Sequence, residues 1–157
     1  KLVVTLKSNL LHGLGLTQSS VYLSRFAGDR VNKDNELGIS VTLLPNFTAA
    51  ELSSPQAPLA EMATDVDLGA FNGKSKLKGI VLLANKGQSP LEIKMLQVYN
   101  PGLSVSLPKT TLRPGETTEM KIVVSTAVDR FRGSRKVLLI TNDPRHPKIL
   151  VNVTTKK

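Results

Sequence analysis

The sequence contains no cysteine and no tryptophan, and only two of its 157 residues are histidines. Without cysteine the chain can form neither a disulfide framework nor a thiolate metal site. A nucleophilic serine or threonine needs a neighbouring base, and His12 and His146 lie in different parts of the sequence. The acidic residues are scattered and lack the spacing of metal ligands. We therefore predict that the protein is not an enzyme and carries no cofactor or metal.

Aromatic residues make up only 4% of the chain. A surface that stacks bases or sugar rings would therefore have few rings to use. No apolar run approaches the ~20 residues of a membrane span, and no signal peptide is visible. Because the chain begins with Lys1, we expect its native start to lie upstream, where a leader or a lipid anchor would be found.

Short apolar runs separated by turn residues dominate the part of the chain after residue 64. Arg113–Glu116 is a turn sequence, because proline fixes φ at about −65° and glycine accepts positive φ. No helix long enough to connect parallel strands interrupts the runs. Their spacing is typical of an antiparallel β-sandwich. Seven strands are predicted, at residues 65–71, 77–84, 91–98, 103–107, 117–125, 135–141 and 148–154.

The apolar pattern of these strands indicates which are covered on one face and which on two. Residues 117–125 and 148–154 alternate between apolar and polar, which indicates a single buried face. Residues 82–83 and 138–140 are apolar on both faces. We expect these central strands to be touched on the second face by a neighbour or by a preceding domain.

The first part of the chain is too short for a second complete sandwich. Strands are expected at 1–6, 20–26 and 38–44, whereas a sandwich needs about seven. The next segment is rich in Ser, Ala and Pro, as linkers are, and its Thr48–Glu51 fits either a capping box or a polar loop. We predict strands of an incomplete β domain at 1–45, a linker at 46–63 and a β-sandwich at 64–157.

Three motifs in this last region are shared with a known family. They are Asn85-x-Gly87-x-Ser89-Pro90-Leu91-x-Ile93, Leu112-x-Pro114-Gly115-Glu116 and Thr141-Asn142-Asp143-Pro144-x-x-Pro147. With them the chain resembles the immunoglobulin-like domains of unknown function in Bacteroidetes envelope proteins, which are related to ASPM/Hydin-type and PapD-like sandwiches. The resemblance implies an all-β, immunoglobulin-like antiparallel sandwich, often in tandem with a second copy. It also implies a periplasmic, cell-surface or secreted location.

The same resemblance implies a structural or interaction module, because the family has no established activity. Many members carry a Cys-Gly-Cys-Thr motif after the third strand, where this chain has Tyr99–Leu103. A redox or metal role tied to those cysteines therefore does not transfer. The expected partner is a protein or a surface polymer.

Basic side chains are the one feature of the sequence with binding potential. Residues 1–63 carry five basic and five acidic side chains, so the net charge of +9 falls entirely within residues 64–157. An electrostatic partner would meet this part of the chain. Two groups of residues are candidates for binding a phosphate-rich polymer, an acidic glycan or a lipid headgroup. They are Lys74, Lys76 and Lys78 at the start of one strand, and Arg130, Arg132, Arg135 and Lys136 before another.

Both basic groups also have a structural interpretation. Lysines protect an edge strand from aggregation, and arginines solvate a hairpin loop. Net charge alone gives weak, salt-sensitive association with any polyanion, and the lack of interleaved aromatics argues against dedicated nucleic-acid binding. Two hypotheses stay open. One is a non-enzymatic structural or interaction module, and the other is an anion- or nucleic-acid-binding module that uses the basic groups.

Overall fold

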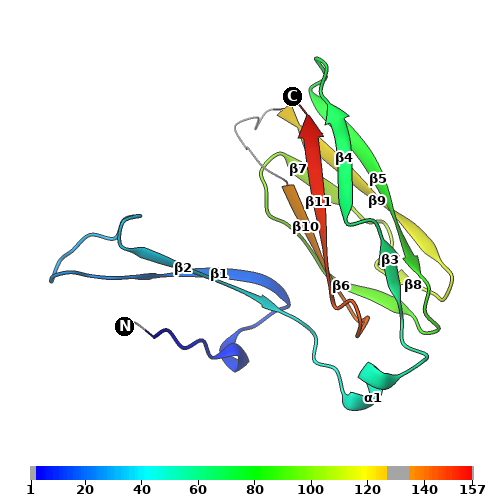
Figure 1. Cartoon of the computed structure of the whole chain (residues 1–157), viewed down its shortest axis with the longest axis horizontal. Coiled ribbons are helices and arrows are strands. Elements are labelled where there is room, and N and C mark those ends of the chain that lie inside the picture. Colours follow the sequence, from blue (N-terminus) through cyan, green and yellow to red (C-terminus); the bar gives the residue numbers. More distant parts are fainter. Residues whose placement is uncertain (1–2, 127–134, 157) are drawn as a thin grey trace. The chain divides into compact units, whose positions relative to one another are not determined.

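The computed structural model describes residues 3–126 and 135–156, and nearly all of its regular structure is β (Figure 1). Its internal contacts divide the chain into two units, Lys1–Leu43 and Leu44–Lys157. Within the described ranges, no helix has the length and apolar character that crossing a membrane requires.

The first unit is built around a two-stranded hairpin. A short 3-10 helix, η1 (Ser8–Leu10), precedes β1 (Gly15–Tyr22) and β2 (Glu36–Leu43), which pair antiparallel. The prediction of a strand at 38–44 is confirmed, and the strand predicted at 20–26 lies earlier, in β1. The strand predicted at 1–6 is wrong for its described residues 3–6, because β1 and β2 pair only with each other and leave this segment without a partner.

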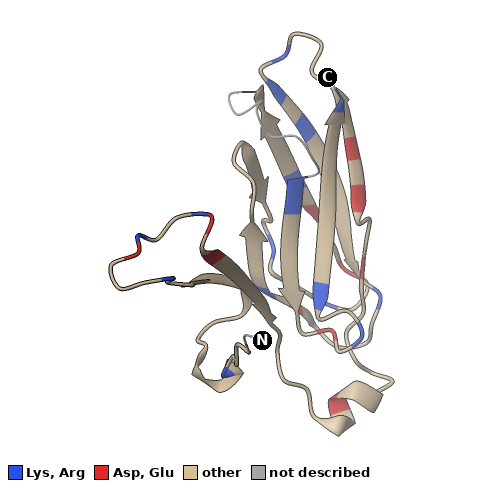
Figure 2. Ribbon diagram, turned by 60° about the vertical axis from the view of Figure 1, so that its left-hand side comes forward, with Lys and Arg blue, Asp and Glu red and all other residues tan. Residues whose placement is uncertain are grey.

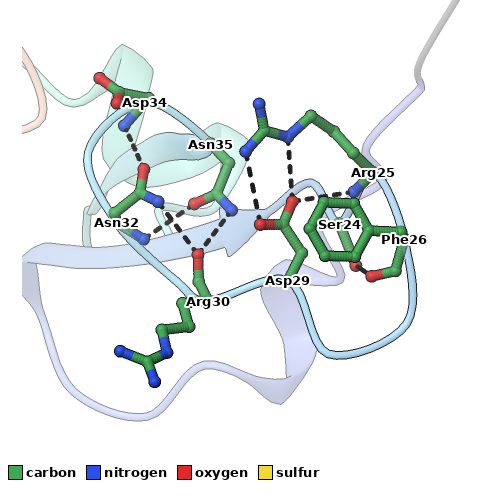
Figure 3. Close-up of polar contacts among 8 residues, drawn as sticks. All are labelled: Ser24, Arg25, Phe26, Asp29, Arg30, Asn32, Asp34 and Asn35. Carbon is green, nitrogen blue, oxygen red and sulfur yellow. Dashed lines mark hydrogen bonds and ion pairs between the residues drawn. The ribbon is translucent and has the colours of Figure 1, made fainter.

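Polar side chains close the loop between β1 and β2 (Figure 3). The carboxylate of Asp29 accepts hydrogen bonds from the backbone N–H and the Nε of Arg25, both at 3.1 Å. Nδ2 of Asn35 donates to the carbonyl oxygen of Arg30 at 3.0 Å, and its Oδ1 accepts from the N–H of Asn32 at 2.9 Å. Such side-chain contacts replace the backbone pairing that a loop lacks.

The second unit is a two-layered β-sandwich, which confirms the predicted all-β, immunoglobulin-like fold. One sheet has five strands in the order β4-β11-β10-β6-β8, and the other has four in the order β3-β5-β9-β7. All neighbouring strands are antiparallel except β4 and β11. The strands are β3 (Ala60–Met62), β4 (Asp65–Ala70), β5 (Lys76–Asn85), β6 (Leu91–Val98), β7 (Leu103–Ser106), β8 (Thr111–Leu112), β9 (Thr117–Ser125), β10 (Arg135–Thr141) and β11 (Lys148–Lys156).

All seven strands predicted after residue 64 are present. The short strands β3 and β8 are additional, so the described part of the sandwich has nine strands. Of the two interpretations of residues 48–51, the structure has the capping box: Oγ1 of Thr48 accepts from the N–H of Glu51 at the start of helix α1 (Ala49–Ser53), and the Glu51 side chain accepts from the N–H of Thr48. Helix α1 and β3 both lie within residues 46–63.

The core lies between the two sheets and follows the period-two pattern of the sequence. Along β9, Met120, Ile122 and Val124 are fully buried, whereas Glu119 and Lys121 are exposed. On β5 the inward position 79 is a glycine. A Cβ there would lie 2.3 Å from Cδ2 of Leu68, so the missing side chain makes room for β4.

The first strand of the sandwich is divided between the two sheets. β3 pairs with Leu83–Asn85 of β5, and the chain then crosses to the other sheet, where β4 pairs in parallel with β11. β5 continues along β9 from Lys76 to Ala84. Among the described residues, β9 is therefore the only strand paired with Lys76–Leu82 of β5.

Candidate interaction surface

The buried carboxylate of Asp143 holds backbone in place. Its Oδ2 accepts from the N–H of Ala60 at 2.8 Å and lies 2.9 Å from Nδ1 of His146, and its Oδ1 accepts from the N–H of Arg145 at 2.8 Å. The hydroxyl of Thr141 donates to the carbonyl oxygen of His146 at 2.8 Å and not to the imidazole ring. This arrangement fastens β3 to the turn after β10 and provides no activated nucleophile.

The side chain of Asn85, at the end of β5, also holds backbone segments in place. Its Nδ2 donates to the carbonyl oxygens of Ser89 at 2.8 Å and Leu112 at 3.0 Å, and its Oδ1 accepts from the N–H of Gly87 at 2.9 Å and of Leu59 at 3.4 Å. Asn85 and Asp143 together therefore hold two consecutive residues of the segment that enters the sandwich. The motif residues that carried the family resemblance are structural at these two positions.

The structure separates the basic residues singled out in the sequence. Lys76 and Lys78 are exposed on β5, whereas Lys74 precedes the strand in a turn, where its N–H donates to the carbonyl oxygen of Phe71 at 2.8 Å. Lys136 is exposed, but Arg135 is only 3% exposed and its Nη1 donates to Oγ1 of Thr155 at 3.3 Å. Arg130 and Arg132 lie outside the described residues.

Lys76 and Lys78 share one face of β5 with two exposed apolar side chains. Ile80 and Leu82 follow them at period two, and each is 59% exposed. We call these four residues the β5 outer face. The next strand, β9, places Val123 opposite Lys78 and Lys121 opposite Ile80. The exposed Glu119 of β9 lies opposite Leu82 on the same face. The outer face of the four-stranded sheet therefore combines an exposed apolar pair with charged side chains of both signs. Figure 2 shows lysine and arginine on strands of the sandwich as well as in its turns.

Sequence reasoning identified the two lysines and missed the role of the apolar pair. The sequence does contain the period-two pattern that indicates this face, in Lys76, Lys78, Ile80 and Leu82. The pattern does not show which face is exposed, because the exposed Leu82 is followed by the buried Leu83 and the strand is apolar on both faces there.

A groove lies beside Ile80 and Leu82 of β5, at the point where β3 ends. Its volume is about 780 Å³, and its walls include Met62, Val66, Ile80 and Leu82 together with the carboxylates of Asp65 and Asp67. A hydrogen bond from the N–H of Gly69 and the ammonium group of Lys156 hold the pKa of Asp67 below its ordinary value. Oδ1 of Asp65 accepts from Nδ2 of Asn152 at 3.0 Å, so both carboxylates already have partners.

The described residues contain no group of three or more His, Asp or Glu side chains placed to hold a metal ion.

Comparison with known proteins gives one family match. The model described as the HYDIN/CFA65/VesB-like, Ig-like domain matches residues 58–156. The match begins just before Leu59 and Ala60, the residues that Asn85 and Asp143 hold. No curated protein matches the chain.

Two solved structures are similar to the chain in fold. A protein of unknown function from Porphyromonas gingivalis W83 has 23% identity and a TM-score of 0.70, and the match covers 92% of this chain and 67% of that one. The VesB protease of Vibrio cholerae has 15% identity and a TM-score of 0.53, over 69% of this chain and 33% of the protease. The matched part of the chain thus covers about one third of the length of VesB.

Proposed function

Since the chain belongs to the HYDIN/CFA65/VesB-like Ig-like domain family, we propose that it is a non-catalytic interaction module that binds a protein through the β5 outer face. The observation that carries this proposal is the exposure of Ile80 and Leu82 side by side on a sheet. Residues two apart on a strand point to the same face, about 7 Å from each other. A partner can therefore cover both side chains at once.

The composition of the face supports a protein partner. Protein interfaces commonly combine an apolar centre with a polar rim. Ile80 and Leu82 supply the apolar part here, and Lys76, Lys78 and Lys121 supply charged groups beside it. Covering the apolar pair removes its surface from water, which contributes about 25 cal/mol per Å² of apolar area buried.

The polar groups inside the sandwich support a role without catalysis. Asp143 and Asn85 are both fully buried, and their hydrogen bonds go to backbone groups and to the ring of His146. These side chains stabilise the fold. A protein that only binds a partner can use these buried groups for stability alone and its surface residues for binding.

The proposal extends to location and to the neighbouring domain. A periplasmic, cell-surface or secreted location rests on the likeness to envelope proteins and on the VesB name within the family. Residues 1–45 are proposed to be the final strands of a preceding domain. Fractionation of the producing cells with an antibody against the sandwich tests the location, and recovery in the cytoplasm would contradict it.

Substitution of the apolar pair tests the binding proposal. The double variant Ile80→Ser/Leu82→Ser should lose a protein that the native chain retains by cross-linking and affinity capture from extracts of the producing cells. The matched control is Val31→Ser/Leu52→Ser, which removes two side chains of similar exposure elsewhere. A partner that is retained equally by all three proteins would show that the β5 outer face is not the binding surface.

A second function, anion binding, is favoured by a separate observation. Lys76, Lys78 and Lys121 lie on the same face of one sheet, so a polyanion could contact all three. Salt distinguishes the two functions, because binding to a polyanion weakens steeply as ionic strength rises, whereas apolar docking does not. Binding to heparin that survives high salt would establish a dedicated anion site.

A further inference from the structure

The hydrogen bonds at the end of β5 show which of its backbone groups face away from β9. The N–H of Lys86 donates to the carbonyl oxygen of Leu59 at 2.8 Å, on the side of β3. The N–H of Asn85 donates to the carbonyl oxygen of Glu116 at 3.0 Å, on the side of β9. Since the backbone groups of successive strand residues point to opposite sides, the even-numbered residues of β5 face the β3 side.

Within the described ranges no strand covers the even-numbered residues of β5 from Lys76 to Leu82, and three of them lie next to the end of β3. They are Lys78, Ile80 and Leu82, whose pairing with β9 is continuous and without a bulge. β3 ends opposite Leu83, and β4 pairs with β11 in the other sheet. We call the N–H and C=O groups of these three residues the open edge. The groove of about 780 Å³ described above is lined by Ile80 and Leu82 of this edge, so there is space for a further segment beside them.

We propose that the partner of the β5 outer face is an extended peptide segment that adds to the open edge as a further strand, in continuation of β3. This inference rests on the proposed function and specifies the chemistry of the partner. Only a peptide backbone presents alternating donors and acceptors at the spacing of a strand. The segment runs antiparallel to β5, because β3 already does so and because antiparallel pairing is the more stable arrangement.

The side chains of β5 specify which residues this segment carries. An antiparallel segment meets Leu82 and Ile80 first and then Lys78 and Lys76. Lys76 and Lys78 lie opposite Ser125 and Val123 on β9, so neither has a carboxylate opposite it in the sheet. None of the ion pairs among the described residues involves either lysine. Cross-strand pairs of like chemistry or opposite charge stabilise a sheet.

The expected ligand is therefore a segment with two apolar residues followed by two acidic residues at alternating positions. A peptide of sequence T-V-T-I-T-E-T-E-T represents this pattern. Two control peptides keep its length. One replaces both glutamates with lysine, and the other carries N-methyl groups on the residues whose N–H would face β5.

The test is titration of the whole ¹⁵N-labelled chain with each peptide, followed by amide hydrogen exchange. We expect the unmodified peptide to bind and to slow exchange at Lys78, Ile80 and Leu82 by about tenfold or more, because strand pairing protects edge amides. The lysine peptide and the N-methylated peptide should give no protection. Absence of protection with the unmodified peptide at saturating or millimolar concentration would overturn the inference.

The outcomes distinguish this inference from the proposed function. If the unmodified and N-methylated peptides bind equally, the side chains of the outer face suffice, and strand addition is wrong while the proposed function stands. If neither peptide binds and Ile80→Ser/Leu82→Ser also retains every protein captured by the native chain, both proposals fail. Protection of the open edge by heparin, or by raising the concentration of the chain alone, would assign the edge to a polyanion or to a second copy and overturn the peptide assignment.

A matched pair of variants tests the same edge from the side of the protein. Lys78→Pro and Lys78→Ala both remove the charge, but only proline also removes the N–H that faces the open edge. Proline is tolerated at edge positions of this kind. We expect Lys78→Pro to bind the peptide about tenfold more weakly than Lys78→Ala, as loss of one backbone hydrogen bond implies. Equal affinity of the two variants would contradict pairing at this residue, and the N-methylated peptide gives the same comparison if Lys78→Pro does not fold.

Discussion

The carboxylate of Asp143 accepts a hydrogen bond from the N–H of Ala60 at 2.8 Å, although the two residues are 83 positions apart in the sequence. The contact joins the first strand of the sandwich to the turn between its last two strands. Because Asp143 is fully buried and also accepts from the N–H of Arg145, its removal leaves several donors without an acceptor.

Asp143→Ala should therefore lower the free energy of unfolding of the sandwich by about 3 kcal/mol, the cost of leaving buried donors unsatisfied. Denaturant unfolding followed through the amide signals of β9 and β11 measures it. Glu119→Ala, which removes an exposed carboxylate, is the control and should change stability by less than about 0.5 kcal/mol. Equal stability of the two variants would mean that the Asp143 contacts contribute nothing.

Gly79→Ala should destabilise the sandwich by about 1–3 kcal/mol, because the new methyl group enters the space occupied by Leu68. The cost should shrink in a Leu68→Ala background, where that space is empty. Strict additivity of the two substitutions in a double-mutant cycle would argue against the contact. Gly38→Ala is the control, since a Cβ at Gly38 meets nothing within 4 Å.

Gly115→Val should cost about 1–3 kcal/mol, because Gly115 has φ of +76°, where a β-branched side chain is strained. This positive φ was predicted from the Pro-Gly turn. Gly115→Asn is the informative comparison, since asparagine tolerates the left-handed region better. Thermal unfolding should place the asparagine variant between the native chain and the valine variant, and a valine variant that melts like the native chain would contradict the strain.

Glu116 gives a prediction about pH. Its side chain accepts from Nζ of Lys109 and from the N–H of Arg113, and these hydrogen bonds hold its pKa below the ordinary value. A carboxyl with a lower pKa in the folded state stabilises the fold above its unfolded pKa, and that contribution disappears as pH falls through the folded pKa. Glu116→Gln should therefore reduce the loss of stability on acidification through about pH 4. Identical pH profiles for the native chain and the variant would refute the assignment.

Binding to polyanions should depend on position as well as on net charge if the β5 outer face is an anion site. Lys76→Glu/Lys78→Glu would then weaken binding to heparin more than Lys7→Glu/Lys33→Glu does, although both pairs change the net charge equally. Isothermal titration calorimetry with heparin at two salt concentrations measures the affinity of both double variants. Equal weakening by both pairs would show that binding follows net charge alone, as expected for unselective association.

Much of the fold could be predicted from the sequence because the sandwich strands alternate or are bounded by turn residues. Residues 117–125 show both features, and the structure places a strand at the same bounds. The family resemblance is also confirmed, by the match to residues 58–156. β8 was not predictable, because two residues carry no period and its strand exists only through pairing with Leu91 and Glu92.

The candidate surface was only partly predictable, for a physical reason. Lysines at period two identify a strand face, but whether its other members are covered depends on which strand lies beside β5. β3 ends after three residues, and the chain then crosses to the other sheet. This crossing depends on tertiary packing, so the local sequence does not predict it. The prediction that the first 45 residues end an incomplete domain stays a prediction.

The divided first strand also has a mechanical consequence. β4 and β11 are parallel, with Asp65 opposite Asn152 and Val66 opposite Val153, so the chain enters β4 at one end of the pair and leaves β11 at the other. Tension applied between the two ends of the sandwich would pull these strands along their length in opposite directions. Their hydrogen bonds would share that load in shear instead of opening one after another. The direction in which the chain runs through β4 thus favours resistance to stretching forces.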